Sequence, residues 1–225
     1  MIGYTSSSEP VLIVSGEARL VGVLELPRSP CGMVLFTQGN GLRRLSPRNG
    51  YLVGELLHAG LATLLLDLLG LDEDSGDEHS VDIARLGTRL AAATDWLVAE
   101  PETKRLALGL FCTGSDTAAA LQLAACRPDQ IAAVVSRGGQ PDLAGPGALA
   151  RVRAPTLLIV GEQDRSVIER NRRALDQLGC EKDLAVIRGA THPCAEQGSL
   201  QEVARLAARW FKGYFGGQTR PALQP

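Results

Sequence analysis

Side chains suited to acyl-transfer chemistry follow three short apolar runs in this 225-residue sequence. Residues 106–110 are followed by F-C-T-G-S-D-T, which contains two candidate nucleophiles, Cys112 and Ser115. Asp164 ends the segment G-E-Q-D after residues 156–160, and His192 ends R-G-A-T-H after residues 184–187. Nucleophile, acid and histidine therefore occur in the chain order of a known hydrolytic triad.

Each residue type in this set has a definite chemical task. The histidine takes the proton of the nucleophile and returns it to the leaving group, while a carboxylate fixes the imidazole tautomer. We therefore expect Asp164 to hydrogen-bond His192. Taken singly, Asp164 also suits a helix N-cap and His192 a surface loop. A further segment, T-Q-G-N-G at residues 37–41, has glycines that let its backbone approach a substrate and donate to an oxyanion.

The apolar runs and the helical patterns between them predict the elements that position these side chains. Two alternating stretches, 11–14 and 19–26, predict an antiparallel hairpin. Runs without alternation are typical of strands buried on both faces, and they occur at residues 33–36, 63–66, 106–110, 131–135, 156–160 and 184–187. Helical patterns cover residues 49–59, 81–99, 115–126, 168–178 and 200–215. This alternation predicts an α/β fold with a doubly wound, mostly parallel sheet, in which ligands bind at the carboxyl ends of the strands.

Composition narrows the class of protein further. The formal net charge is −2, so no basic field favours nucleic acid as a partner. The sequence contains no apolar run of about 18 residues, and we expect no membrane partner. Five scattered cysteines without a C-x-x-C pair predict reduced thiols and no zinc site. The N-terminus resembles no export signal, so we expect a cytoplasmic protein. One domain is expected over residues 1–215, with a flexible tail at 216–225.

Five stretches of the sequence carry a resemblance to a known family. They are L-S-P-R-N at 45–49, A-A-T-D-W-L at 92–97, V-V-S-R-G-G-Q-P-D-L-A-G at 134–145, A-P-T-L-L-I-V-G at 154–161 and G-A-T-H at 189–192. Together they resemble the dienelactone-hydrolase-like branch of the α/β-hydrolase superfamily, in a subgroup also found fused to phosphoribosyltransferase domains. The resemblance implies an α/β-hydrolase fold, no cofactor and no metal, with the acid at Asp164 and the histidine at His192.

The nucleophile motif departs from that family. Where the subgroup has L-G-x-F-G-A-S-T-G, residues 108–116 are L-G-L-F-C-T-G-S-D, so an ungapped alignment places Gly114 at the serine position. Three interpretations stay open. The turn shifts by one residue and Ser115 is the nucleophile, or Cys112 is the nucleophile, or the position is vacant and hydrolysis has been lost. The family's H-G-x-G also changes, because Gln38 stands at the histidine position.

Several residues are expected to bind the substrate or its oxyanion. They are Gln38, Gly39, Asn40, Asp116 and Arg137. Other arginines of the same predicted sheet edge are Arg43, Arg44, Arg48 and Arg165. Guanidinium groups bind carboxylates and phosphates, so these arginines suggest an anionic small-molecule substrate. Solvated loop arginines explain the pattern as well. The leading function is hydrolysis of a small ester, lactone or thioester. The alternative is a non-catalytic binding or regulatory protein with an empty nucleophile position at Gly114.

Overall fold

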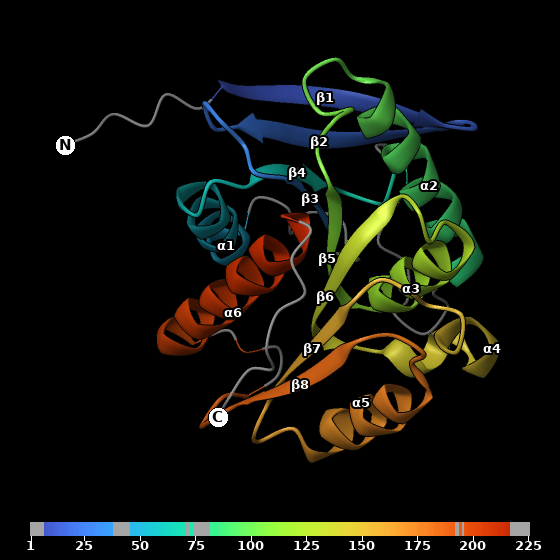
Figure 1. Cartoon of the computed structure of the whole chain (residues 1–225), viewed down its shortest axis with the longest axis vertical. Helices are drawn as coiled ribbons and strands as arrows, with labels where there is room; N and C mark the ends of the chain where they lie inside the picture. The colour runs from blue at the N-terminus through green and yellow to red at the C-terminus, as the bar shows by residue number, and fades with distance from the viewer. Residues whose placement is uncertain are drawn as a thin grey trace.

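An eight-stranded sheet forms the centre of the computed structural model, which describes residues 7–37, 46–70, 73, 82–191, 194 and 196–216 (Figure 1). The strand order is β1-β2-β4-β3-β5-β6-β7-β8, and β4, β3 and β5–β8 run parallel. The strands are β1 Ser7–Ser15, β2 Ala18–Leu26, β3 Met33–Thr37, β4 Ala62–Leu66, β5 Leu108–Gly114, β6 Ile131–Gly139, β7 Thr156–Gly161 and β8 Lys182–Ile187. The first two form an antiparallel hairpin, and β2 continues antiparallel onto β4.

Helices cover both faces of the sheet. Those described are α1 Pro47–His58, α2 Ile83–Ala99, α3 Asp116–Cys126, α4 Pro146–Leu149, α5 Arg165–Gln177 and α6 Gln197–Phe215, with a 3₁₀ turn, η2, at Pro141–Ala144. Helices α1 and α6 pack together on one face, and α2 to α5 lie on the other (Figure 1). The predicted α/β-hydrolase type of fold, with its N-terminal hairpin, is confirmed.

Side-chain alternation along each strand divides the core into two parts. On β5, Leu110 and Cys112 face α2 and α3, whereas Phe111 faces the side of α1 and α6 and stacks on Phe36 with ring centroids 4.4 Å apart. All five residues of β3 and of β4 are buried. Strands covered on both sides need no alternation of polar and apolar residues, which explains their continuous apolar sequences.

Two segments differ from the sequence-based prediction. Strand β5 extends to Gly114 rather than stopping at residue 110, because Phe111, Cys112 and Thr113 continue to pair with β6. Strand β6 extends to Gly139 rather than stopping at residue 135, and η2 and α4 follow it. The leucine of α4, Leu149, is buried in the core. Residues 217–225 of the expected tail lie outside the described part, and no described helix could span a bilayer.

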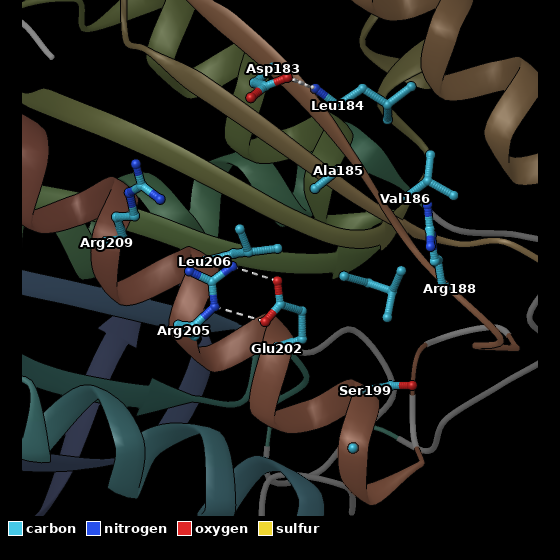
Figure 2. A pocket seen from close by; sticks show the side chains of 12 residues that line it. Asp183, Leu184, Ala185, Val186, Arg188, Ser199, Glu202, Arg205, Leu206 and Arg209 are labelled. Carbon is cyan, nitrogen blue, oxygen red and sulfur yellow. Dashed lines mark hydrogen bonds and ion pairs between the residues drawn. The ribbon is translucent and has the colours of Figure 1, made fainter. Parts of the chain in front are cut away.

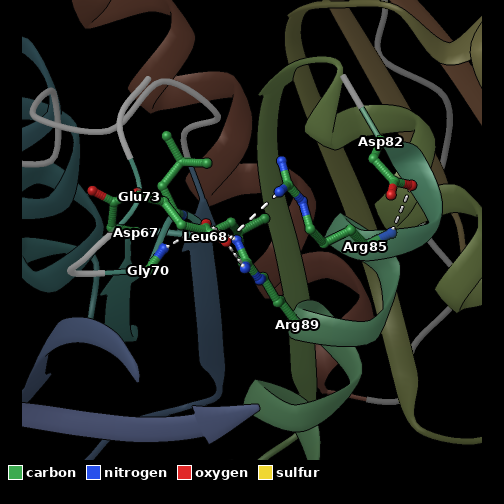
Figure 3. A network of polar contacts seen from close by, with 8 residues as sticks. Asp67, Leu68, Gly70, Glu73, Asp82, Arg85 and Arg89 are labelled. Carbon is green, nitrogen blue, oxygen red and sulfur yellow. Dashed lines mark hydrogen bonds and ion pairs between the residues drawn. The ribbon is translucent and has the colours of Figure 1, made fainter. Parts of the chain in front are cut away.

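A buried arginine joins α2 to the end of β4. Arg89 is only 5% exposed, and its guanidinium donates to the Leu68 carbonyl at 2.7 Å and to both carboxylate oxygens of Glu73 at 2.6 and 2.5 Å (Figure 3). The same carboxylate accepts from the Gly70 N–H and lies 3.6 Å from Arg85. The Arg89 guanidinium is the main reason why the pKa of Glu73 falls to about 2. Charge and hydrogen bonding are therefore satisfied together at this buried cation.

We expect Glu73→Gln to lower the free energy of unfolding by about 2 kcal/mol, because a neutral amide leaves the Arg89 charge uncompensated. Urea denaturation at pH 7 measures this change. Glu169→Gln is the matched control, since Glu169 pairs with Arg173 on the exposed face of α5 at 3.0 Å. That variant should lose less than about 0.5 kcal/mol. Equal losses in the two variants would show that the buried Arg89–Glu73 pair contributes no more to the free energy of unfolding than an exposed pair does.

Candidate active site

The turn between β5 and α3 contains a left-handed residue, and that residue is Gly114. Its φ is +54°, and its carbonyl accepts a hydrogen bond of 2.9 Å from the Gln140 N–H. A Cβ atom built on Gly114 would meet no atom within 4 Å. The left-handed conformation strains residues that carry a side chain, so the turn geometry fits glycine. This is the position at which the ungapped alignment places the family's serine.

Ser115 follows directly and is the N-cap residue of α3. Its backbone is right-handed, with φ −69°, and its carbonyl accepts from the Ala118 N–H at 3.0 Å. Its side chain is half-buried and makes no capping hydrogen bond. The Ser115 hydroxyl therefore does not cap α3.

Cys112 lies inside β5 and not on the turn. The side chain is fully buried against the core on the α2 and α3 side, and burial raises the pKa of its thiol strongly, with a further rise from Asp116. The neighbouring Thr37 hydroxyl, at the end of β3, opposes the rise. An enclosed thiol that stays protonated at neutral pH is a poor nucleophile, so this geometry disfavours Cys112 in that role.

Asp116, the first residue of α3, carries a buried carboxyl group. It is 0% exposed, and neither carboxylate oxygen has a hydrogen-bond partner of acceptable geometry in the described part of the chain. Burial raises its pKa to about 7, the negative charge of Asp67 adds to the rise, and the nearby Thr37 hydroxyl opposes it. The sequence placed Asp116 near the site but gave no sign that its carboxyl group would be enclosed.

Asp164 stands where β7 meets α5, as predicted. Its Oδ1 accepts from the Val167 N–H at 3.1 Å and from the Ser166 hydroxyl at 3.0 Å, so it is also the N-cap of α5. Capping by this residue explains why α5 begins at residue 165 rather than at 168.

The loop between β7 and α5, at residues 162–164, is fastened by hydrogen bonds to the loop at 188–191 that leads to His192. The Gln163 N–H donates to the Ala190 carbonyl at 3.0 Å, and the Gln163 side chain donates to the Gly189 carbonyl at 3.0 Å. The Gly189 N–H in turn donates to Glu162 at 2.8 Å. At Gly161, an added Cβ would lie 2.6 Å from the carbonyl oxygens of residues 190 and 191, so only glycine fits there. The chain therefore reaches residue 191 beside the acid.

Four predicted site residues lie outside the described residues: Gln38, Gly39, Asn40 and His192. The expected hydrogen bond between Asp164 and His192 falls there too, as do Arg43 and Arg44. The described chain still shows where these segments start, because Thr37 ends β3 beside Cys112 and Thr191 follows the fastened loop. Their strands belong to the same carboxyl edge of the sheet as Ser115 and Asp164.

Arg137 lies within β6 and is 2% exposed, although the sequence suggested a residue just after a strand. Its charge acts on Cys194, and Cys194 is also influenced by Asp164, which places Arg137 close to the predicted acid. Cys194 is buried and has a left-handed backbone, with φ 58°. Sequence reasoning did not single out Cys194, because no motif marked it.

A groove of about 890 Å³ lies elsewhere, along the edge strand β8 and helix α6 (Figure 2). Its polar lining includes Arg188 and Arg209, and a pair in which Glu202 accepts two hydrogen bonds from Arg205 at 2.8 and 2.6 Å. No predicted site residue lines this groove, so it is separate from the candidate active site.

Known proteins resemble this chain in sequence and in fold. No family model matches the sequence. Two proteins of Mycobacterium tuberculosis, each named "Putative phosphoribosyl transferase", are 44% identical over 209 residues, which is 93% of this chain and 47% of theirs. The chain thus spans about half the length of these curated relatives. The structure of a dienelactone hydrolase from Anabaena variabilis is 46% identical and matches with a TM-score of 0.88, covering 94% of this chain and 99% of that one. An esterase domain from Rhodothermus marinus, 21% identical, shares the fold with a TM-score of 0.74 over 93% of this chain and all of that domain.

We expect the buried Asp116 carboxyl group to make stability fall as the pH rises. The folded protein keeps this proton up to about pH 7, whereas an unfolded aspartate releases it near 3.8, so stability declines between those values. Asp116→Asn should remove about 2–3 kcal/mol of the loss between pH 5 and pH 8. Urea unfolding at both pH values measures the slope, and Asp176→Asn, on the exposed face of α5, should keep the wild-type slope. An unchanged slope in Asp116→Asn would contradict this account.

The thiols offer an independent check of burial. In native protein a disulfide reagent should react rapidly with Cys31 and Cys126, which are exposed, and slowly with Cys112 and Cys194, which are buried. All five cysteines should react after denaturation without reductant, since all five are free. Mass spectrometry of peptides after timed labelling identifies each site. Rapid labelling of Cys112 in native protein would mean that its thiol is accessible, and Cys112 would again be a candidate nucleophile.

Proposed function

Since the chain belongs to the dienelactone hydrolase family, we propose that it hydrolyses a small carboxylic ester, lactone or thioester, with Ser115 as nucleophile, His192 as base and Asp164 as the group that orients the histidine. The solved structure that is 46% identical supports the reaction class. The longer mycobacterial relatives share only about half their length with this chain, and the proposal concerns that shared part.

The observation that carries the proposal is the position of the Ser115 hydroxyl. It is half-buried at the carboxyl end of β5 and takes no part in capping α3, whereas the thiol of Cys112 is enclosed in the core. The loops that carry Asp164 and lead to His192 are fastened to each other at the same edge of the sheet. These observations support Ser115 as the attacking hydroxyl.

The proposed reaction proceeds through an acyl-enzyme. The Ser115 oxygen attacks the substrate carbonyl while His192 takes its proton, and the proton then passes to the leaving alcohol or thiol. The oxyanion would receive hydrogen bonds from the Asp116 N–H, at the positive end of α3, and from the backbone of the segment that contains Gly39 and Asn40. Water, activated by His192, then releases the acid. The Asp164 Oδ1 atom already accepts the capping hydrogen bond of α5. We therefore expect the Oδ2 atom to accept the hydrogen bond that orients the histidine.

Turnover of an activated aryl ester tests the proposal. Ser115→Ala and His192→Ala should each lower kcat at least about 100-fold, because each removes a member of one catalytic unit. Labelling of wild-type protein by a fluorophosphonate should disappear in Ser115→Ala. Ser15→Ala, in the N-terminal hairpin, is the matched control and should keep both activity and labelling.

Gly114→Ser distinguishes the proposal from the vacant-site alternative. If Ser115 is the nucleophile, a second hydroxyl in the left-handed position adds strain of about 1–2 kcal/mol and gives no increase in kcat. Wild-type protein without His192-dependent turnover, combined with a gain of such turnover in Gly114→Ser, would overturn the proposal. The wild-type chain would then be a binding protein on a hydrolase fold.

A further inference from the structure

The described part of the chain contains two deeply buried arginines, and only one of them has its donors satisfied. Arg89 makes three hydrogen bonds, two of them to the carboxylate of Glu73. Arg137 is buried still further, at 2% exposure, yet its Nε and Nη1 atoms are enclosed and have no hydrogen-bond partner in the described part. A buried guanidinium needs both a counter-charge and acceptors for its N–H groups. Arg137 lacks what Arg89 has.

The charged groups near Arg137 do not supply a counter-ion. Arg48, the second residue of α1, repels it, and burial together with this repulsion lowers the pKa of Arg137 to about 10. The guanidinium therefore stays charged at neutral pH. Cys194 is the neighbour that could carry a negative charge, but burial raises the pKa of its thiol to about 11, so it is neutral under the same conditions. Two cations thus lie near each other. The carboxylates of Asp164 and Glu196 act on Cys194, but neither forms an ion pair with Arg137 in the described part of the chain.

The fold places this unpaired cation beside the candidate active site. On β6, Ser136 faces α3, where its hydroxyl lies 2.9 Å from that of Thr117, and alternation turns Arg137 to the face covered by α1 and α6. Arg137 is three residues before Gln140, whose N–H donates to the Gly114 carbonyl, so it lies near the carboxyl end of the strand. Arg48 brings the N-terminal, positive end of the 12-residue helix α1 to the same region.

We propose that Arg137, assisted by Arg48 and the N-terminus of α1, binds the oxyanion group of a small-molecule ligand, either a phosphate or a carboxylate. Such a group supplies the two things that Arg137 lacks, since one oxyanion neutralises the charge and accepts two N–H groups at once. The inference goes beyond hydrolysis, because anion binding at Arg137 does not require the Ser115 hydroxyl.

Direct titration of the full chain tests the site, with inorganic phosphate and succinate as separate probes in isothermal titration calorimetry. Phosphate at ten times its Kd should raise the wild-type Tm by roughly 3–5 °C over potassium chloride of equal ionic strength. Arg137→Met should weaken binding of the preferred anion at least 10-fold. Arg173→Met removes one charge from the exposed face of α5 and should change the affinity less than 2-fold. This variant controls for the change in net charge and for the general stabilising effect of phosphate salts. The stronger probe identifies the ligand's anionic group.

The stability of the variants gives a second readout. Without added anion, Arg137→Met should unfold at the same Tm as wild type or higher, because it removes an uncompensated buried charge. Arg137→Lys should fold and bind with intermediate affinity, since it keeps the charge and loses the paired donors. The proposal is overturned if neither anion binds, if Arg137→Met binds as wild type does, or if it loses several degrees of Tm in anion-free buffer. Ser115→Ala should bind the anion normally, so loss of hydrolysis and loss of binding are scored separately.

Discussion

The six parallel strands share one carboxyl edge, and every proposed chemical group depends on that constraint. Parallel pairing requires each chain segment to return over a face of the sheet, so the ends of β3, β5, β6 and β7 meet along one line. Groups separated by dozens of residues become neighbours there without any local sequence signal. Hydrogen bonding between strands thus fixes the spacing between the β5–α3 turn, the buried Arg137 and Asp164.

That edge holds buried ionisable groups that a structure selected only for stability would avoid. Asp116 and Arg137 are both buried without hydrogen-bond partners in the described chain, and they lie on opposite faces of the sheet. Each costs free energy that the two core clusters must offset. Unsatisfied polar groups of this kind gather where a protein binds or transforms another molecule. Their position at the carboxyl edge therefore agrees with a functional site, whereas Arg89, bound just beyond the end of β4, is paired with Glu73.

Much of this could be predicted from the sequence, and the exceptions have physical reasons. The continuous apolar runs identified the parallel strands, and the segment after residues 156–160 located Asp164 between β7 and α5. The extension of β5 was missed because F-C-T-G resembles a turn, although its pairing with β6 keeps it extended. Burial of Arg137 and of Asp116 could not be foreseen, because it depends on helices distant in the sequence. The identity of the nucleophile stayed open for a related reason, since a left-handed φ at Gly114 is a property of the folded turn.

The fastening of the loop at 162–164 to the loop at 188–191 has a consequence for how this site can evolve. Its bonds join backbone groups of residues 189 and 190 to Gln163 and Glu162, so substitutions outside the two loops leave the bonding groups unchanged. The β5–α3 turn has no such tie to either loop among the described hydrogen bonds. Substitutions on the turn at Gly114 and Ser115 therefore leave the hydrogen bonds between the two loops intact. A lineage on this scaffold can lose, move or regain a nucleophile at the turn by single-residue steps while the two loops keep their hydrogen bonds to each other.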